Sequence, residues 1–161
     1  MNNQQSLNNQ VQSLTLPPLL KNQPLSLKSR YLIVRADVGS KFGQTTPVEV
    51  RLLVDTGASY TLLPIKVLND LGYDTQNPHN WHPGIVTGKG KTKRIPIVQV
   101  SSFSCLGKQI IDFPVLAFTL PKSPHQQYWR GVVGMDFLSH FEAVILLAKA
   151  GSKRKNEIRL R

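Results

Sequence analysis

The strongest chemical signal in the sequence is a carboxylate at the end of an apolar segment. Asp55 follows residues 52–54 (Leu-Leu-Val) and precedes Thr56 and Gly57. The apolar residues favour a buried strand, and Gly57 permits backbone conformations that other residues resist, so a substrate chain can approach closely. Thr56 is stiff at χ1 and carries a hydroxyl that can bond a neighbouring backbone. The pattern predicts a carboxylate held in a tight turn, although Asp-Thr-Gly by itself also occurs in ordinary turns.

Two further segments follow this carboxylate in a set order. Residues 85–100 have the pattern of a long hairpin, with Gly88 and Gly90 near its turn. An apolar strand pattern at 131–134 then leads into a short helical pattern at 135–138. These three elements in series, within about residues 30 to 161, resemble the aspartic protease superfamily. The resemblance is to its single-domain retropepsin-like members, of prokaryotic or cellular rather than viral type.

The resemblance assigns a role to each of these segments. It implies that Asp55 is the catalytic residue. The active-site loop would comprise Thr56, Gly57, Ala58 and Ser59. A flap that binds substrate would contain Val86, Thr87, Gly88, Lys89 and Gly90. Structural support of the site would come from Val132, Val133 and Gly134.

The implied activity is that of an aspartic endopeptidase acting on a peptide or protein substrate. Two aspartates share one proton, because adjacent like charges do not both ionise, and they activate a water that attacks the peptide carbonyl. The chain has one Asp-Thr-Gly sequence and no internal repeat. The second aspartate must therefore be Asp55 of a second copy, on the axis of a twofold homodimer. The resemblance implies neither a metal nor a cofactor.

Two positions depart from the viral members of the family. Those members carry an acidic residue where this chain has Ser59 and an arginine where it has Met135. In the family the two positions form an ion pair that supports the loop and the dimer. Both partners are absent here, so no buried charge is left unpaired. The strength of the viral dimer and the viral substrate contacts are therefore not carried over to this chain.

Strand-like segments dominate the sequence and predict an all-β fold, a closed acid-protease barrel with a flap hairpin and one or two short helices. The expected strands lie at 31–38, 48–54, 61–63, 103–111, 113–120, 131–133, 143–148 and 157–160, with a helix after Pro64 and a loop at 77–84. Residues 1–28, rich in Asn, Gln and Pro, are expected to form a flexible arm, and residues 29–161 the protease domain. Within that domain we expect the flap at about 84–98 and a C-terminal interface strand at about 156–161.

The chain is strongly basic, with 20 Lys and Arg against nine Asp and Glu and a net charge of +11. The basic residues concentrate at 89–94 and 153–161, which we interpret as solvated loops. A basic nucleic-acid-binding protein stays open as one alternative, although no nucleic-acid-binding signature is seen. A catalytically quiet retropepsin-like domain, used as a dimeric binding or scaffold module, is the other.

Several residues have simpler interpretations. The single cysteine, Cys105, excludes a disulfide framework within the chain and is expected to be a small buried hydrophobe. His79 and His82 lie in a Pro-bounded segment and are expected in a surface loop rather than at a metal. Asp136 opens a helical segment, so a capping role is expected. The absence of a membrane span and of a secretory signal pattern makes a cytoplasmic protein the expectation.

Overall fold

The computed structural model describes residues 31–43, 46–84, 86–87, 90–91, 94–120, 128–148 and 156–161. The expected arm at 1–28 lies outside the described residues. Gly88 and Lys89 of the expected flap also lie outside them. Within the described residues no helix is long and apolar enough to cross a membrane.

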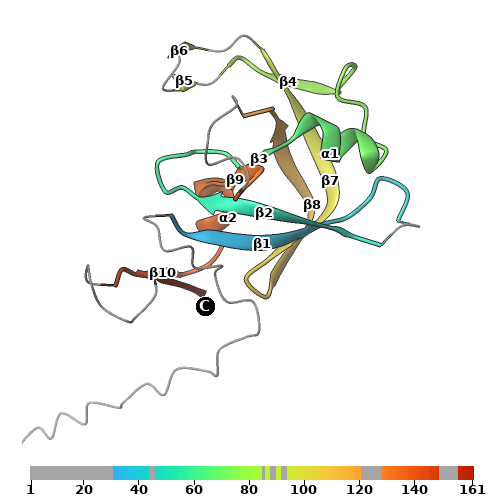
Figure 1. Cartoon of the computed structure of the whole chain (residues 1–161). Helices are drawn as coiled ribbons and strands as arrows, with labels where there is room; N and C mark the ends of the chain where they lie inside the picture. Colours follow the sequence, from blue (N-terminus) through green and yellow to red (C-terminus); the bar gives the residue numbers. More distant parts are fainter. Residues whose placement is uncertain are drawn as a thin grey trace, which may run out of the picture.

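Six strands of the described chain close into a barrel (Figure 1). Their order around the barrel is β1 (Ile33–Val38), β2 (Val48–Val54), β9 (Gly131–Val133), β3 (Leu62–Leu63), β8 (Lys108–Ala117) and β7 (Ile95–Cys105). Pairing of β7 with β1 closes the ring, so neither strand leaves a long unpaired edge. The all-β class expected from the sequence is confirmed.

Two parallel pairings bring distant segments together at one end of the barrel. β2 pairs with β9, with Val54 opposite Val133, and β3 pairs with β8. The residue after β2 is Asp55 and the residue after β9 is Gly134. The parallel register therefore places these two strand ends side by side, because parallel strands run in one direction.

The segment leading to the expected flap contains a strand that the sequence did not indicate. The expected loop at 77–84 is wrong for Asn80–His82, which form β4 and pair antiparallel with β7. Pairing with a long neighbouring strand outweighs the turn-forming prolines on either side. β5 (Val86–Thr87) and β6 (Gly90–Lys91) then form a hairpin inside the expected range, seen at the top of Figure 1.

The expected strand at 103–111 is also wrong. β7 ends at Cys105 and β8 begins at Lys108, with these two residues paired. Leu106 and Gly107 between them have φ of 54° and 77°. Positive φ at both central residues is the requirement of a two-residue type I′ hairpin turn, whose twist matches that of the flanking strands. A Leu-Gly pair is a weak signal for such a turn, which is why the sequence pattern predicted one continuous strand across it.

Two short helices complete the described part of the domain, as expected. α1 spans Ile65–Asp70 and α2 spans Met135–Leu138. After α1, Gly72 has a φ of 86° and its N–H bonds Asn69 O at 3.0 Å, while the N–H of Tyr73 bonds Leu68 O at 3.0 Å. This left-handed glycine stop satisfies the free carbonyls at the end of the helix.

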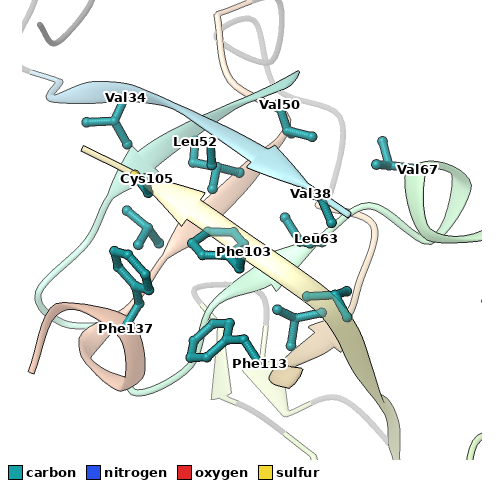
Figure 2. Packing of buried hydrophobic residues seen from close by; sticks show 14 of the residues in the cluster. Val34, Val38, Val50, Leu52, Leu63, Val67, Phe103, Cys105, Phe113 and Phe137 are labelled. Atoms are coloured by element: carbon teal, nitrogen blue, oxygen red, sulfur yellow. The ribbon is translucent and has the colours of Figure 1, made fainter. Parts of the chain in front are cut away.

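The main hydrophobic core fills the barrel (Figure 2). Phe103, Phe113 and Phe137 form a triangle of rings whose centroids lie 5.0, 5.3 and 5.7 Å apart. All three side chains are buried, and Phe137 comes from α2, so this helix is anchored in the core. Cys105 is also buried there, as expected of a small hydrophobe, and burial raises the pKa of its thiol to about 12.

The chain ends in a separate antiparallel pair of strands, β10 (Ala143–Leu146) and β11 (Glu157–Leu160). The strand expected at 157–160 is present. Ile158 of β11 is only 4% exposed and belongs to the main core. The end of the chain is therefore packed on the barrel, and its role as an interface stays a prediction.

Candidate active site

Asp55 lies directly after β2, and the loop itself orients its carboxylate. The N–H of Gly57 donates to Asp55 Oδ1 at 2.9 Å, and the N–H of Ala58 donates to Asp55 O at 3.1 Å. The N–H of Asp55 donates across to Val133 O of β9 at 3.2 Å. The carboxylate is half-buried. Backbone on both sides of the residue thus holds it in one place, as the Asp-Thr-Gly pattern predicted.

The other residues of the expected active-site loop differ in exposure. Thr56, Gly57 and Ser59 are exposed, and Ala58 is half-buried. Ala58 packs on a second, smaller hydrophobic cluster whose buried members are Leu62, Ile95, Leu116 and Val132. This cluster contains residues of β3, β7, β8 and β9, so the loop rests on four strands of the barrel.

Gly134 allows the loop to lie against the start of α2. A Cβ atom at this glycine would come within 2.5 Å of Tyr60 C and 2.9 Å of Ala58 O, which are backbone atoms. The close approach lets the N–H of Met135 donate to Ala58 O at 2.8 Å and that of Asp136 to Ser59 O at 3.1 Å. The free N–H groups of the first helical turn thereby satisfy two loop carbonyls.

Thr61 and Asp136 add side-chain bonds to this junction. Thr61 Oγ1 donates to Asp136 Oδ1 at 2.7 Å, and the N–H of Thr61 donates to Asp136 Oδ2 at 2.8 Å. The Thr61 hydroxyl also accepts the N–H of Gly134 at 3.2 Å. Sequence reasoning missed this pair, because the two residues are 75 positions apart and nothing local marks either one.

The expectation that Asp136 caps the helix is wrong, because Asp136 is not the N-cap residue. The helix is capped by Gly134, with no side-chain cap, and Asp136 lies in the first turn. Its Oδ1 accepts the N–H of Phe137 at 2.8 Å in addition to the bonds from Thr61. Burial raises the pKa of the Asp136 carboxyl, and the hydrogen bonds from Thr61 and Phe137 and the nearby His140 partly offset that rise.

The missing viral ion pair has a structural counterpart in this chain. Ser59 and Met135, at the two positions concerned, are both exposed. Their segments are joined by the backbone bonds of α2 and by the contact between Thr61 and Asp136. Hydrogen bonds therefore connect the loop and the helix in this chain.

The remaining candidate residues lie as follows. Val132 and Val133 are buried in β9 and Gly134 follows them, and their role in structural support of the site stays a prediction. In the hairpin, Val86 is paired with Lys91 and Thr87 with Gly90. His79 is exposed, whereas His82 is half-buried in β4, so the surface-loop expectation is wrong for His82. Among the described residues no cluster of three or more His, Cys, Asp or Glu could hold a metal.

Comparisons with known proteins agree with this geometry. A family model described as aspartyl protease matches residues 36–137. The fold is similar to the crystal structure of a retropepsin-like aspartic protease from Rickettsia conorii, with a TM-score of 0.58 and 20% sequence identity. That match covers 86% of this chain and 87% of the Rickettsia chain. No curated protein sequence matches. The matched segment includes Asp55, β9 and the first three residues of α2, and the chain therefore belongs to the aspartyl protease family and has a retropepsin-like fold.

Proposed function

We propose that the protein is an aspartic endopeptidase whose active site combines Asp55 from each of two copies of the chain. The observation that carries this proposal is the carboxylate of Asp55, half-buried and oriented by the Gly57 N–H at the junction of β2 and β9. A carboxylate held in one orientation suits general acid and base chemistry. Two such groups facing each other would share one proton and activate a water for attack on a peptide carbonyl.

The proposal requires a second copy because the mechanism uses two aspartates and the chain supplies one in this sequence context. Asp136 belongs to α2, whose first turn bonds the active-site loop, and its carboxylate is bonded to Thr61 and Phe137. The 161 residues contain one Asp-Thr-Gly sequence. Twofold pairing supplies an identical Asp55 on the other side of the axis. In this arrangement Thr56 would tie the two loops together and residues 86–90 would close over the substrate as a flap.

The sheet formed by β10 and β11 supports a dimer through the chain ends. In the described structure β10 and β11 pair only with each other, so each strand keeps an unpaired edge. Unpaired edges of this kind accept strands of a second copy. Leu146 of β10 is 47% exposed, so this two-stranded sheet also offers apolar surface. We propose residues 156–161 as an interface strand of a protease domain that spans 29–161.

The proposal is tested by incubating the protein with a peptide library at several pH values, with and without a statine-type inhibitor. Wild-type protein should cleave, and Asp55→Asn should not, because Asn keeps the shape but cannot exchange the proton. Asp70→Asn is the matched control, since Asp70 is an exposed carboxylate on α1 paired with Lys66. Cleavage that survives in purified Asp55→Asn protein would exclude the mechanism.

The same experiment separates the two alternatives from the protease. Peptides that bind the wild-type protein without being cut would favour the dimeric binding module. A salt-sensitive shift of nucleic acid without peptide cleavage would favour the basic nucleic-acid-binding protein.

A further inference from the structure

β4 is an appended strand, and its only strand partner in the described structure is β7. It lies at the end of the sheet order, outside the closed ring of six strands. Three residues, Asn80–His82, pair with 95–97 of β7. The chain continues from β4 through Gly84 into the hairpin of β5 and β6. A strand this short, paired on one side, is held weakly by its ladder and depends on side-chain contacts for its position.

A ring contact joins this strand to the active-site loop. The rings of Tyr60 and His82 lie with their centroids 4.7 Å apart and their planes at 65°, an edge-to-face arrangement. Such pairs are attractive beyond the apolar area that they cover, because the ring edge is positive and the face negative. The contact bridges the loop that begins at Asp55 and the strand that leads to the hairpin.

Tyr60 differs from its neighbour Thr61 in exposure. Its neighbour Thr61 is fully buried and bonds Asp136, whereas Tyr60 is 41% exposed. The carbonyls of Ala58 and Ser59 bond the first turn of α2, which covers the inner side of the loop. The ring of Tyr60 is therefore partly exposed, and it contacts the ring of His82.

The ring of His82 is itself held in place. The N–H of Gly84 donates to His82 Nδ1 at 3.3 Å. An accepting Nδ1 carries no proton, so this bond corresponds to the tautomer with hydrogen on Nε2. His82 thus has two separable contacts, a ring contact to Tyr60 and an acceptor contact to the start of the hairpin segment.

We infer that His82 is a positioning residue: its ring contact with Tyr60 sets the spacing between the Asp55 loop and strand β4, and so the width of the peptide-binding space beside that loop. The inference rests on the proposed function, because it assumes that a peptide lies between the loop and the hairpin. Loss of the ring contact would leave Asp55 and its hydrogen bonds in place. It would therefore weaken peptide binding more than the chemical step.

Two substitutions separate the two contacts of His82. His82→Phe keeps a ring against Tyr60 and loses the acceptor, whereas His82→Asn keeps an acceptor near the Nδ1 position and loses the ring. Trp81→Ala is the matched control, because Trp81 is next along β4, projects to the opposite face and is 39% exposed. The control removes the contact between Trp81 and Arg94 and leaves the contact between His82 and Tyr60 in place.

The first measurement is the affinity of a fluorescent peptide for each variant in an Asp55→Asn background, where no cleavage interferes. We expect His82→Asn to raise Kd about three- to tenfold, with His82→Phe and Trp81→Ala within about twofold of the parent. In the Asp55 form, His82→Asn should raise KM by a similar factor and leave kcat within about twofold. Adding Tyr60→Leu to His82→Asn should cause little further loss, because both remove one contact.

The inference is overturned if His82→Asn binds peptide as tightly as the parent, if His82→Phe is as weak as His82→Asn, or if Trp81→Ala is equally weak. Its failure and that of the proposed function give different results. Cleavage with an unchanged KM in His82→Asn excludes the inference alone. Peptide binding that follows the expected order without any cleavage by wild-type protein excludes the protease and keeps the positioning role. A parent protein that binds no peptide excludes both.

Discussion

The hydroxyl of Thr61 lies 2.7 Å from one carboxylate oxygen of Asp136, and the backbone N–H of Thr61 lies 2.8 Å from the other. Thr61 has no exposed surface and Asp136 is half-buried, so these bonds are partly shielded from water. The same hydroxyl accepts the N–H of Gly134. The residue before Gly134 is Val133, whose carbonyl accepts the N–H of Asp55. Thr61 therefore joins three segments that meet at the candidate active site.

Removal of the carboxylate at this junction should lower stability. Asp136→Ala leaves the buried N–H and hydroxyl of Thr61 without their acceptor, at a cost of about 1–3 kcal/mol per unsatisfied group. The free energy of unfolding in urea measures the loss. Asp70→Ala, at an exposed carboxylate on α1, is the control and should change it by less than about 1 kcal/mol. Equal effects of the two substitutions would contradict the role of the contact.

The Asp136 carboxyl should make stability depend on pH. Its folded-state pKa is raised, chiefly by burial, so the folded protein binds this proton more tightly than the unfolded chain. The contribution is fully present below the unfolded pKa of about 4 and is lost as pH rises through the folded pKa. Asp136→Asn has no such proton. We therefore compare the unfolding free energy of wild type with that of the variant by subtracting the second from the first. This difference should fall as pH rises from the unfolded pKa to the folded pKa and then level off. An increase over that range would contradict the assignment.

Gly134 should tolerate no side chain, for a steric reason. Its φ of −101° and ψ of −175° suit any residue, but a Cβ would meet the backbone of Tyr60 at 2.5 Å. Gly134→Ala must push the loop away from α2, which should cost about 1–3 kcal/mol and reduce peptide cleavage. Gly43→Ala is the contrast, because Gly43 has a φ of 63° and open space around it. That variant should lose stability through backbone strain and keep its cleavage rate.

The end of the chain should contribute to the stability of each copy as well as to pairing. Ile158 is 4% exposed in the main core, so Ile158→Ala should cost about 2–5 kcal/mol of unfolding free energy. Leu147→Ala, at a side chain that is 77% exposed, should be nearly neutral. Deletion of 156–161 is for this reason a poor test of the dimer alone, since it removes core packing too.

Subunit mixing tests the shared site without disturbing the core. Asp55→Asn protein added in excess to a fixed, dilute amount of wild type should reduce cleavage several-fold, because mixed dimers contain one Asp55. An equal excess of unrelated protein serves as the control. Dilution of wild type alone should lower its specific activity in step with the dimer fraction found by sedimentation. Cleavage unaffected by the added variant would show that one chain acts alone.

Much of the site could be derived from the sequence because its signals are local. The apolar residues before Asp55, the glycine two positions after it and the alternation in β2 are properties of neighbouring residues, and they predicted a carboxylate at a strand end. The same holds for the strand at 157–160. Local stereochemistry limits such segments to few conformations, so pattern and structure agree there.

Only the tertiary structure decided which distant residues act together. Thr61 and Asp136 are ordinary residues by local criteria, and they meet because the parallel pairing of β2 with β9 carries α2 to the loop. His82 lies in a segment with the composition of a loop and becomes part of a strand because β7 offers it a partner. A sequence pattern reflects the conformational preferences of residues that are neighbours along the chain. Contacts across 20 to 80 positions are set by strand register and by burial, which depend on the whole fold at once.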